Sequence, residues 1–200
     1  RLRDDVALAA RHVLEMHDGA AVLAGSLALT TAQAAEAAGP RHGQSAQQVT
    51  SIPAAASTTV DVNAELRYLI EEEKLAYDVY RAMFDAHGTR IFDNISNSEL
   101  THQSAVLPLL ESRGLADPRL GAGEFSDPEL QTLHDQLVAK GVQSPRDALE
   151  VGKAIEEMDI ADLEQVIAGL GPEDADVRNV MENLLKGSRN HLNAFNRQLG

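Results

Sequence analysis

Apolar residues recur at intervals of three and four along most of the chain after residue 60, the spacing of one face of an α-helix. No stretch there alternates apolar and polar residues as a half-buried strand would. The pattern predicts helices over about Asn63–His87, from Asn94 or Ser96 to Arg113, and over about Pro128–Gly141, Pro145–Gly169 and Ala175–Leu199. Pro108 lies inside the second helix and should kink it or end it early.

Residues that start and stop helices support these boundaries. Gly88 follows the first helix, and Ser126-Asp127-Pro128 is a capping sequence with proline at the first helical position. The link between the second and third long helices spans some 30 residues and carries the short helix, whereas the other two links are short. Two helical hairpins joined by one long crossover predict an all-α four-helix bundle.

The chain divides near residue 61. Residues 30–60 are rich in Ala, Thr, Ser, Gln and Gly, with Pro40 and Pro53, and cannot bury enough apolar area to offset the entropy of ordering. We therefore expect residues 1–60 to be a disordered or weakly helical segment that includes a linker, and residues 61–200 to be the bundle domain.

Two interpretations of the first 34 residues stay open. Three arginines precede an apolar run over residues 20–29, and Ala32-Gln33-Ala34 follows it, as in a secretory signal with its cleavage site. Four acidic residues among the first 18 instead favour weak Ala-rich helices with no addressing role. The first interpretation makes the protein exported and the second makes it cytoplasmic. The apolar run is too short for a stable membrane span.

Charge and composition restrict the function. The formal net charge is -14, and because the first 60 residues hold four Arg against five Asp and Glu, residues 61–200 carry 13 of these negative charges. A nucleic-acid-binding domain would need a basic surface instead. The chain has no cysteine. Any metal must be held by oxygen and nitrogen donors, which suit iron, manganese or zinc better than softer metals.

Carboxylates and histidines interrupt the apolar faces of all four long helices. Burying a lone carboxylate costs several kcal/mol, so helices that do this at similar heights need a shared partner, and a multivalent cation is the simplest one. Glu99 and His102 are three residues apart and point the same way from their helix. The predicted metal ligands are Glu73, Glu99, His102, Glu156, Asp159 and His191.

Each of these residues also has an ordinary structural interpretation. Glu99 could pair with Ser96 in a capping box at a helix start. Glu73 ends the acidic run 71–73, and such a run usually lies on a solvated face of a helix. We therefore expect Glu71 and Glu72 to be exposed to solvent, since only Glu73 falls on the apolar face. A lone buried histidine is more often a hydrogen-bonded core residue than a ligand, and Asp159 lies on a helix that is acidic throughout. Tyr77 and Tyr80 are expected to be core aromatic residues.

Four segments resemble the ferritin-like superfamily, and most closely its rubrerythrin-related bacterial and archaeal domains of unknown function. The resemblance covers roughly residues 62–199 and rests on residues 73–80, Glu99-Leu-Thr-His102, residues 152–159 and Gly187-Ser-Arg-Asn-His191. It implies a ferritin-like fold that holds two metal ions between two single glutamates and two Glu-x-x-His pairs.

In this chain the resemblance assigns Glu73 and Glu156 as the single glutamates, Glu99 with His102 as one pair, and His191 as the histidine of the other pair. Ser188 stands where the second pair should have its glutamate. Either Asp159 supplies the missing carboxylate, or the second ion is weakly held or absent.

The resemblance implies a di-iron or di-manganese oxidoreductase that acts on oxygen or peroxide. A metal-binding or storage module without turnover, and a metal-free helical scaffold, are the alternatives. Since no cysteine is available for a rubredoxin-type centre in this chain, turnover would use an external reductant or a dismutation that needs none. The expected partners are metal ions and a small oxidant, and a homo-oligomer is compatible with the sequence.

Overall fold

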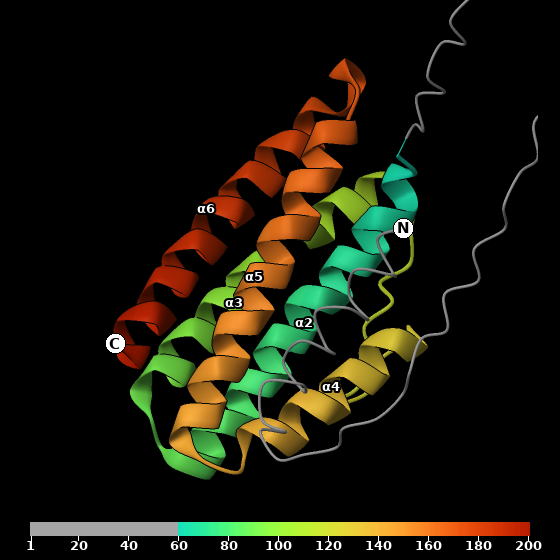
Figure 1. Cartoon of the computed structure of the whole chain (residues 1–200). Coiled ribbons are helices and arrows are strands. Elements are labelled where there is room, and N and C mark those ends of the chain that lie inside the picture. The colour runs from blue at the N-terminus through green and yellow to red at the C-terminus, as the bar shows by residue number, and fades with distance from the viewer. Residues whose placement is uncertain (1–59) are drawn as a thin grey trace, which may run out of the picture. The chain divides into compact units, whose positions relative to one another are not determined.

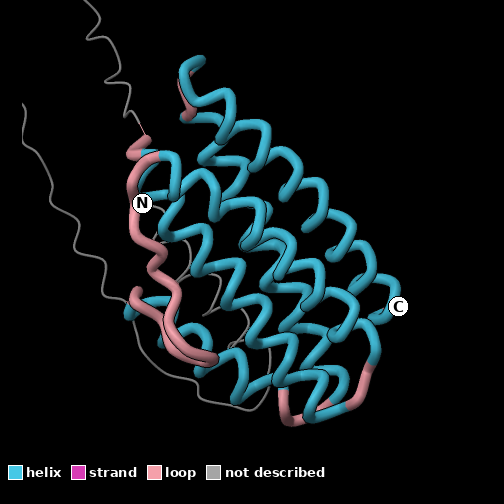
Figure 2. Tube along the Cα trace, turned by 180° about the vertical axis from the view of Figure 1, so that it is seen from behind, coloured by secondary structure: helices cyan, strands magenta, loops and turns pink. Residues whose placement is uncertain are grey.

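The computed structural model describes residues 60–200, and every regular element in them is helical (Figure 1). The α-helices are α2 (Val62–His87), α3 (Arg90–Ser112), α4 (Pro128–Gly141), α5 (Pro145–Gly169) and α6 (Ala175–Leu199), and the 3₁₀ helix η1 (Pro172–Asp174) precedes α6. Seen from behind, the rest of this region consists of connecting loops (Figure 2). In residues 60–200, no helix is both long and apolar enough to cross a membrane.

The long helices pair as two hairpins. α2 packs chiefly against α3 and α5 against α6, and the hairpins meet through contacts of α2 with α5 and of α3 with α6. Helix α4 lies in the crossover and packs against α2 and α5. The predicted helical bundle with a short crossover helix is therefore confirmed. The predictions for the N-terminal segment fall on residues that the structure does not describe, and the domain boundary near residue 61 stays a prediction.

Side chains cap three helix starts, among them the predicted cap at Asp127. The Asp61 carboxylate accepts hydrogen bonds from the first turn of α2, Asp127 does the same for α4, and the Ser144 hydroxyl accepts from the Asp147 amide at the start of α5. At the end of α2, Gly88 has a φ of +66°, a left-handed conformation that favours glycine. Local sequence thus determines where these helices begin and where α2 ends.

Helix α3 begins earlier than predicted, and Pro108 does not end it early. It begins at Arg90, so Ser96 lies within the helix, where its hydroxyl donates to the Asp93 carbonyl. The interpretation of Glu99 as the capping-box partner of Ser96 is therefore wrong. The helix also continues past Pro108 to Ser112. Proline removes one backbone hydrogen bond, and the buried apolar residues on both sides of it keep this helix packed.

The apolar core consists of two clusters, one toward each end of the bundle. One includes Val79, Phe92, Ile155 and Phe195, and the other includes Leu66, Val106, Leu163 and Met181. Each long helix contributes to both clusters. The predicted ligand residues lie in sequence between the two contributions, at mid-height in the bundle. A layer of polar side chains therefore separates two apolar clusters.

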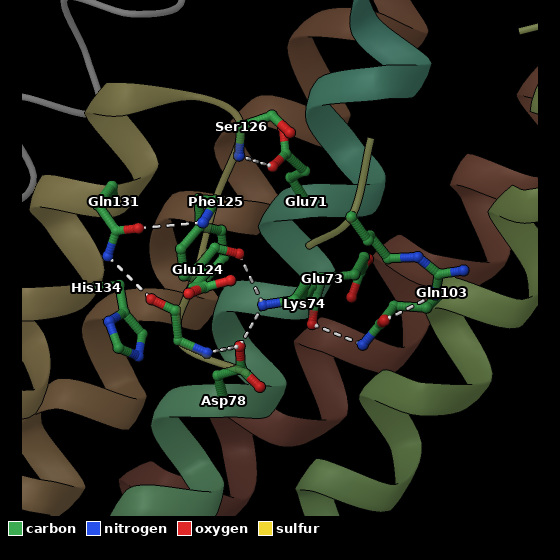
Figure 3. Close-up of polar contacts among 12 residues, drawn as sticks. Glu71, Glu73, Lys74, Asp78, Gln103, Glu124, Phe125, Ser126, Gln131 and His134 are labelled. Atoms are coloured by element: carbon green, nitrogen blue, oxygen red, sulfur yellow. Dashed lines mark hydrogen bonds and ion pairs between the residues drawn. The ribbon is translucent and has the colours of Figure 1, made fainter. Parts of the chain in front are cut away.

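The crossover segment covers the outer side of α2 (Figure 3). Lys74 Nζ donates to Asp78 Oδ2 at 2.5 Å and to the Glu124 carbonyl at 3.1 Å, and the backbone amide of Gly123 donates to Asp78 at 2.9 Å. The Ser126 amide donates to Glu71 at 2.6 Å. α2 is therefore surrounded by protein over these turns.

The expectation that Glu71 and Glu72 lie on a solvated face is wrong. Their exposed fractions are 4% and 2%. The crossover buries Glu71 by hydrogen bonding to it, as described above, and Glu72 faces α5. Helical periodicity alone could not indicate this, because a loop covers Glu71 and the packing of α2 against α5 buries Glu72.

Candidate metal centre

The Glu99 carboxylate on α3 lies at the centre of the polar layer and is 2% exposed. Its Oε2 lies 2.8 Å from Nδ1 of His102, one turn further along the same helix. Its Oε1 lies 3.0 Å from Nδ1 of His191 on α6. The two imidazole rings stack with their centroids 5.6 Å apart. One carboxylate thus faces a histidine with each of its oxygens.

Each histidine also faces a second carboxylate from another helix. Nδ1 of His102 lies 3.1 Å from Oε2 of Glu73 on α2, and Nδ1 of His191 lies 3.5 Å from Oε1 of Glu156 on α5. The side chains form two groups with potential ligand atoms within 4.8 Å of one another: Glu73, Glu99 and His102, and Glu99, Glu156 and His191. The structure therefore brings together five of the six predicted ligands, and Glu99 belongs to both groups.

Asp159, the sixth predicted ligand, lies beside these groups without belonging to either. It is 6% exposed and lies next to Ser188, whose hydroxyl donates to the Leu184 carbonyl at 3.0 Å. The charges of Glu99 and His102 both act on its carboxyl group. Asp159 therefore places a carboxylate close to Ser188, the position where the ferritin-like pattern has a glutamate.

Several buried atoms of these side chains have no hydrogen-bond partner among residues 60–200: Glu73 Oε1, Glu99 Oε1, Asp159 Oδ1 and His191 Nδ1. Nδ1 of His191 is close to Glu99 and Glu156, but neither contact has hydrogen-bond geometry. Buried polar groups are nearly always hydrogen-bonded, so a cluster of unsatisfied atoms requires an explanation. Cations bound in the two groups would give the atoms of Glu73, Glu99 and His191 a partner.

The distances between these atoms fit ligands around shared ions. Neighbouring ligands at right angles, each about 2.1 Å from one ion, lie about 3.0 Å from each other. The four nitrogen–oxygen distances are 2.8, 3.1, 3.0 and 3.5 Å. All donors are oxygen or nitrogen atoms, which suit iron and manganese. The residues present therefore fit a carboxylate–histidine metal centre.

The electrostatics show how strongly the groups interact without a metal. Burial would raise the pKa of Glu99, but its interactions with His102 and His191 outweigh burial and lower it to about 2. Burial would lower the pKa of both histidines, but the surrounding carboxylates raise the pKa of His102 to about 11 and that of His191 to about 10. The metal-free centre thus holds protons on both imidazoles, where a metal would carry the positive charge.

The other carboxyl groups shift in the opposite direction. Burial, with the charge of Asp159 as the next cause, raises the pKa of Glu73 well above its usual range. Burial raises the pKa of Glu156 to about 7, and Glu99 adds to the shift. Burial likewise raises the pKa of Asp159 to about 7. Three carboxyl groups around a charged Glu99 are therefore costly to ionise unless further positive charge is present.

Side chains next to the centre orient its members. The Tyr80 hydroxyl donates to Oε1 of Glu156 at 2.6 Å, and Ser98 Oγ lies 3.0 Å from Nε2 of His191. Gln103 Nε2 donates to the Glu73 carbonyl at 3.3 Å (Figure 3). Such partners fix how a ligand side chain is presented to a metal.

Two helical glycines make room for the centre. A Cβ on Gly187 would lie 2.5 Å from Nε2 of His102, and a Cβ on Gly152 would lie 2.4 Å from the Phe195 ring. Phe195 packs against Tyr80, which holds Glu156. Both glycines are therefore places of close packing, where a larger residue would collide with its neighbour.

Sequence analysis missed the roles of Tyr80 and Ser98. Tyr80 was expected to be a core aromatic residue, with no hydrogen bond to Glu156 predicted, and Ser98 lies outside the apolar face of its helix. Their positions relative to Glu156 and His191 depend on how helices far apart in sequence pack. The three- and four-residue spacing of apolar residues shows which face of a helix is buried, but not which side chains of other helices it meets.

The pKa shifts predict how the metal-free protein responds to pH. The raised pKa values of Glu156 and Asp159 give a stability contribution that is present below pH about 4 and is lost as pH rises through 7. The raised pKa values of His102 and His191 give a second stability contribution, which is present below pH 6.5 and is lost as pH rises toward 10. Glu99 has the opposite effect, because its pKa is lowered on folding to about 2. Its stability contribution is present above its unfolded-state pKa and is lost as pH falls toward 2, so it does not change between pH 5.5 and pH 8.

In EDTA, the melting temperature should therefore fall between pH 5.5 and pH 8 by at least about 3 °C, the shift that ~1 kcal/mol produces in a domain of this size. Circular dichroism at 222 nm would measure it. The double variant Glu156→Gln with Asp159→Asn should lose much of this slope, whereas Glu157→Gln, exposed on the same helix, should keep it. A melting temperature that rises from pH 5.5 to pH 8 would contradict the prediction.

Comparisons with known proteins place the chain in a family. Residues 63–200 match the family described as "Uncharacterized protein domain (DUF2202)". The uncharacterized protein MJ0754 of Methanocaldococcus jannaschii is 49% identical over 131 residues, which cover 64% of this chain and 70% of that protein. A crystal structure of the hypothetical protein MJ0754 from Methanococcus jannaschii aligns with a TM-score of 0.66 and 47% identity, over 68% of this chain and 78% of that one. The chain therefore belongs to the DUF2202 family.

Proposed function

We propose that this domain binds two metal ions, iron or manganese, on either side of the Glu99 carboxylate, and that the fold is ferritin-like. The observation that carries the proposal is the position of Glu99, whose two oxygens face His102 and His191. Glu73 completes the first group and Glu156 the second. A carboxylate shared in this way is what a two-ion centre requires of a bridging ligand.

The unsatisfied buried atoms support two ions rather than one. Oε1 of Glu73 belongs to the first group, whereas Oε1 of Glu99 and Nδ1 of His191 belong to the second. Each group therefore contains at least one donor atom that no protein hydrogen bond satisfies within the described region. A single ion in one group would leave the other group unsatisfied.

When bound, a pair of iron or manganese ions would supply electrons to dioxygen or peroxide, and this redox activity is the second part of the proposal. The protein would contribute ligand geometry, exclusion of water and control of protons. The two apolar clusters enclose the polar layer, and the Tyr80 hydroxyl oxygen lies 2.6 Å from Oε1 of Glu156, to which it donates its proton in a hydrogen bond. A buried tyrosine there keeps the Glu156 side chain in one orientation.

Ser188 favours a second candidate function, metal binding or storage without turnover. Its hydroxyl donates to a backbone carbonyl and brings no negative charge to the second group. The second ion would then depend on Asp159 for a further carboxylate. A weakly held second ion would suit storage or transfer better than repeated two-electron chemistry.

Counting metal ions tests the proposal. Full-length protein loaded anaerobically with Fe(II), or with Mn(II), and then desalted should hold two ions per chain by elemental analysis. Glu99→Gln should lose both because it removes the shared ligand, while His102→Gln should lose chiefly the ion of the first group. Glu157→Gln should match the wild type, since its side chain is exposed on α5. No bound metal in any of the four proteins would leave only the metal-free scaffold, and an equal non-zero content would show that the ions bind at other residues.

Consumption of hydrogen peroxide, or uptake of oxygen by the Fe(II)-loaded protein with ascorbate as external reductant, separates the two candidate functions. An oxidoreductase should turn over many times per chain, and Glu99→Gln should abolish this. A storage module should bind the ions and show at most a single oxidation per ion bound.

Asp159 and Ser188 give a sharper prediction about the second ion. Asp159→Asn should reduce the metal content from two ions toward one, because it removes the carboxylate nearest Ser188. Adding Ser188→Glu to that variant should restore the second ion by returning a carboxylate to the ferritin-like position. If Asp159→Asn keeps two ions and Ser188→Glu gains nothing, Asp159 does not contribute to metal binding.

A further inference from the structure

The two histidines of the metal centre reach the surface of the bundle. The side chain of His191 is 12% exposed and that of His102 is 9% exposed. The ligand glutamates have side chains that are only 2–3% exposed: Glu73, Glu99 and Glu156. Both rings turn Nδ1 toward the carboxylates, so the edge that solvent can reach is the opposite one, which carries Nε2. The centre is therefore closed on the side of the glutamates and accessible on the side of the histidines.

Both outer ring edges lie where α3 meets α6. Nε2 of His191, on α6, lies 3.0 Å from Ser98 Oγ on α3. Nε2 of His102, on α3, lies against Gly187 of α6, where an added Cβ would be 2.5 Å away. Ser98 and Gly187 are both half-buried. The accessible side of the centre is therefore the line along which these two helices meet.

Small residues flank the two ring edges. Steps of three and four residues from Ser98 and from Gly187 give the neighbours that share their sides of the two helices. We call this set the α3–α6 seam: Ser98, Thr101 and Ala105 on α3, and Gly187, Asn190 and Ala194 on α6. All six residues are half-buried or exposed. The seam thus has no large side chain that covers the histidine rings.

The seam is also uncharged, although the chain has a formal net charge of -14. In α3 the only Asp, Glu, Lys or Arg between residues 94 and 110 is Glu99, which is buried. On α6, Lys186 projects about 100° around the helix from Gly187, and Arg189 pairs with Glu164 of α5 at 2.6 Å. An uncharged approach does not concentrate ions of either sign, and a charged molecule would lose hydration in entering it.

Unsatisfied ligand atoms lie directly behind the exposed ring of His191. Its Nδ1 lies 3.0 Å from Oε1 of Glu99, and neither atom has a hydrogen-bond partner within residues 60–200. A molecule that passes the outer edge of the ring therefore arrives at the second ligand group. The space beside the ring is bounded by the Ser98 hydroxyl, so only a small molecule can pass.

We propose that the α3–α6 seam is the entrance through which a small uncharged molecule, dioxygen or hydrogen peroxide, reaches the metal centre. This rests on the proposed function, because it names the side from which the oxidant of that function arrives. The small side chains of the seam select for size, and the lack of charge selects against ionic oxidants. Thr101 and Asn190, exposed at its rim, are the specificity-determining residues that can be changed without touching a ligand.

Dissolved oxygen tests the entrance in the metal-free protein, because it is paramagnetic and accelerates the relaxation of nuclei that it approaches. In full-length protein with carbon-13-labelled histidine, oxygen pressure should accelerate relaxation of the ring Cε1–Hε1 signals of His102 and His191. Single His→Gln variants assign these signals. The double variant Thr101→Trp with Asn190→Trp should reduce the oxygen effect severalfold, because it places two large rings over the seam.

The matched control is Leu100→Trp with Asn196→Trp, which adds the same two rings at exposed positions of the same helices. Leu100 follows Ser98 by two residues and Asn196 follows Gly187 by nine, so each lies on nearly the opposite side of its helix. The control should relax as the wild type does. Melting temperatures check that all three proteins fold, and Asn190→Trp alone replaces a double variant that does not. Equal oxygen effects in all three proteins would overturn the proposal.

Oxidants of different charge test the selectivity of the seam in Fe(II)-loaded protein. One hydrogen peroxide molecule takes one electron from each of two Fe(II) ions and, with two protons, becomes two water molecules. Stopped-flow absorbance should show this oxidation slowed in the Thr101/Asn190 variant, at unchanged metal content, and not in the control. Thr101→Lys should accelerate oxidation by the peroxodisulfate anion and leave oxidation by hydrogen peroxide unchanged. No acceleration with the anion would overturn the assignment of Thr101 to the entrance.

The two measurements separate this proposal from the proposed function. If the protein binds no iron or manganese, the proposed function fails, while the oxygen effect still shows whether molecules reach His102 and His191 through the seam. If the protein binds two ions but oxygen acts equally on the histidines of all three proteins, the proposed function stands and the entrance lies elsewhere.

Discussion

Burial of the Glu99 carboxylate is the constraint on which the rest of this domain depends. An ionised carboxylate that is 2% exposed is costly unless positive charge surrounds it. His102 and His191 supply that charge from both sides, which is why the pKa of Glu99 falls to about 2 although burial acts to raise it. Those histidines in turn contact Glu73 and Glu156. One buried carboxylate thereby connects the four long helices.

Three features of the fold position the layer of polar side chains around Glu99. The two apolar clusters hold the helices at both ends of the bundle, so that the polar side chains meet between them. Gly187 lets the His102 ring fit against α6, where any larger residue would collide with it. The crossover then holds α2 from outside through Lys74, Asp78 and Glu71 (Figure 3). The helix that carries Glu73 is therefore held on all sides.

Most of the fold and the main ligand candidates could be predicted from sequence, because both follow from the spacing of residues along single helices. The predicted ends of α2, α4, α5 and α6 agree closely with the structure, since caps and glycines act locally. The start of α3 was predicted too late: its N-cap residue is Thr89, whose side chain makes no capping hydrogen bond. The burial of Glu71, Glu72 and Asp162 could not be predicted. It depends on a loop and on helix pairing, which leave no periodic pattern in the sequence.

Diffraction from crystals grown with Mn(II), measured at the manganese absorption edge, tests the central claim most directly. Two anomalous peaks should lie on opposite sides of the Glu99 carboxylate, one about 2.0–2.2 Å from Nδ1 of His102 and the other at the same distance from Nδ1 of His191. A single peak in one group would show that the second ion is not held. Anomalous peaks confined to other carboxylates, with none at Glu99, would contradict the metal centre.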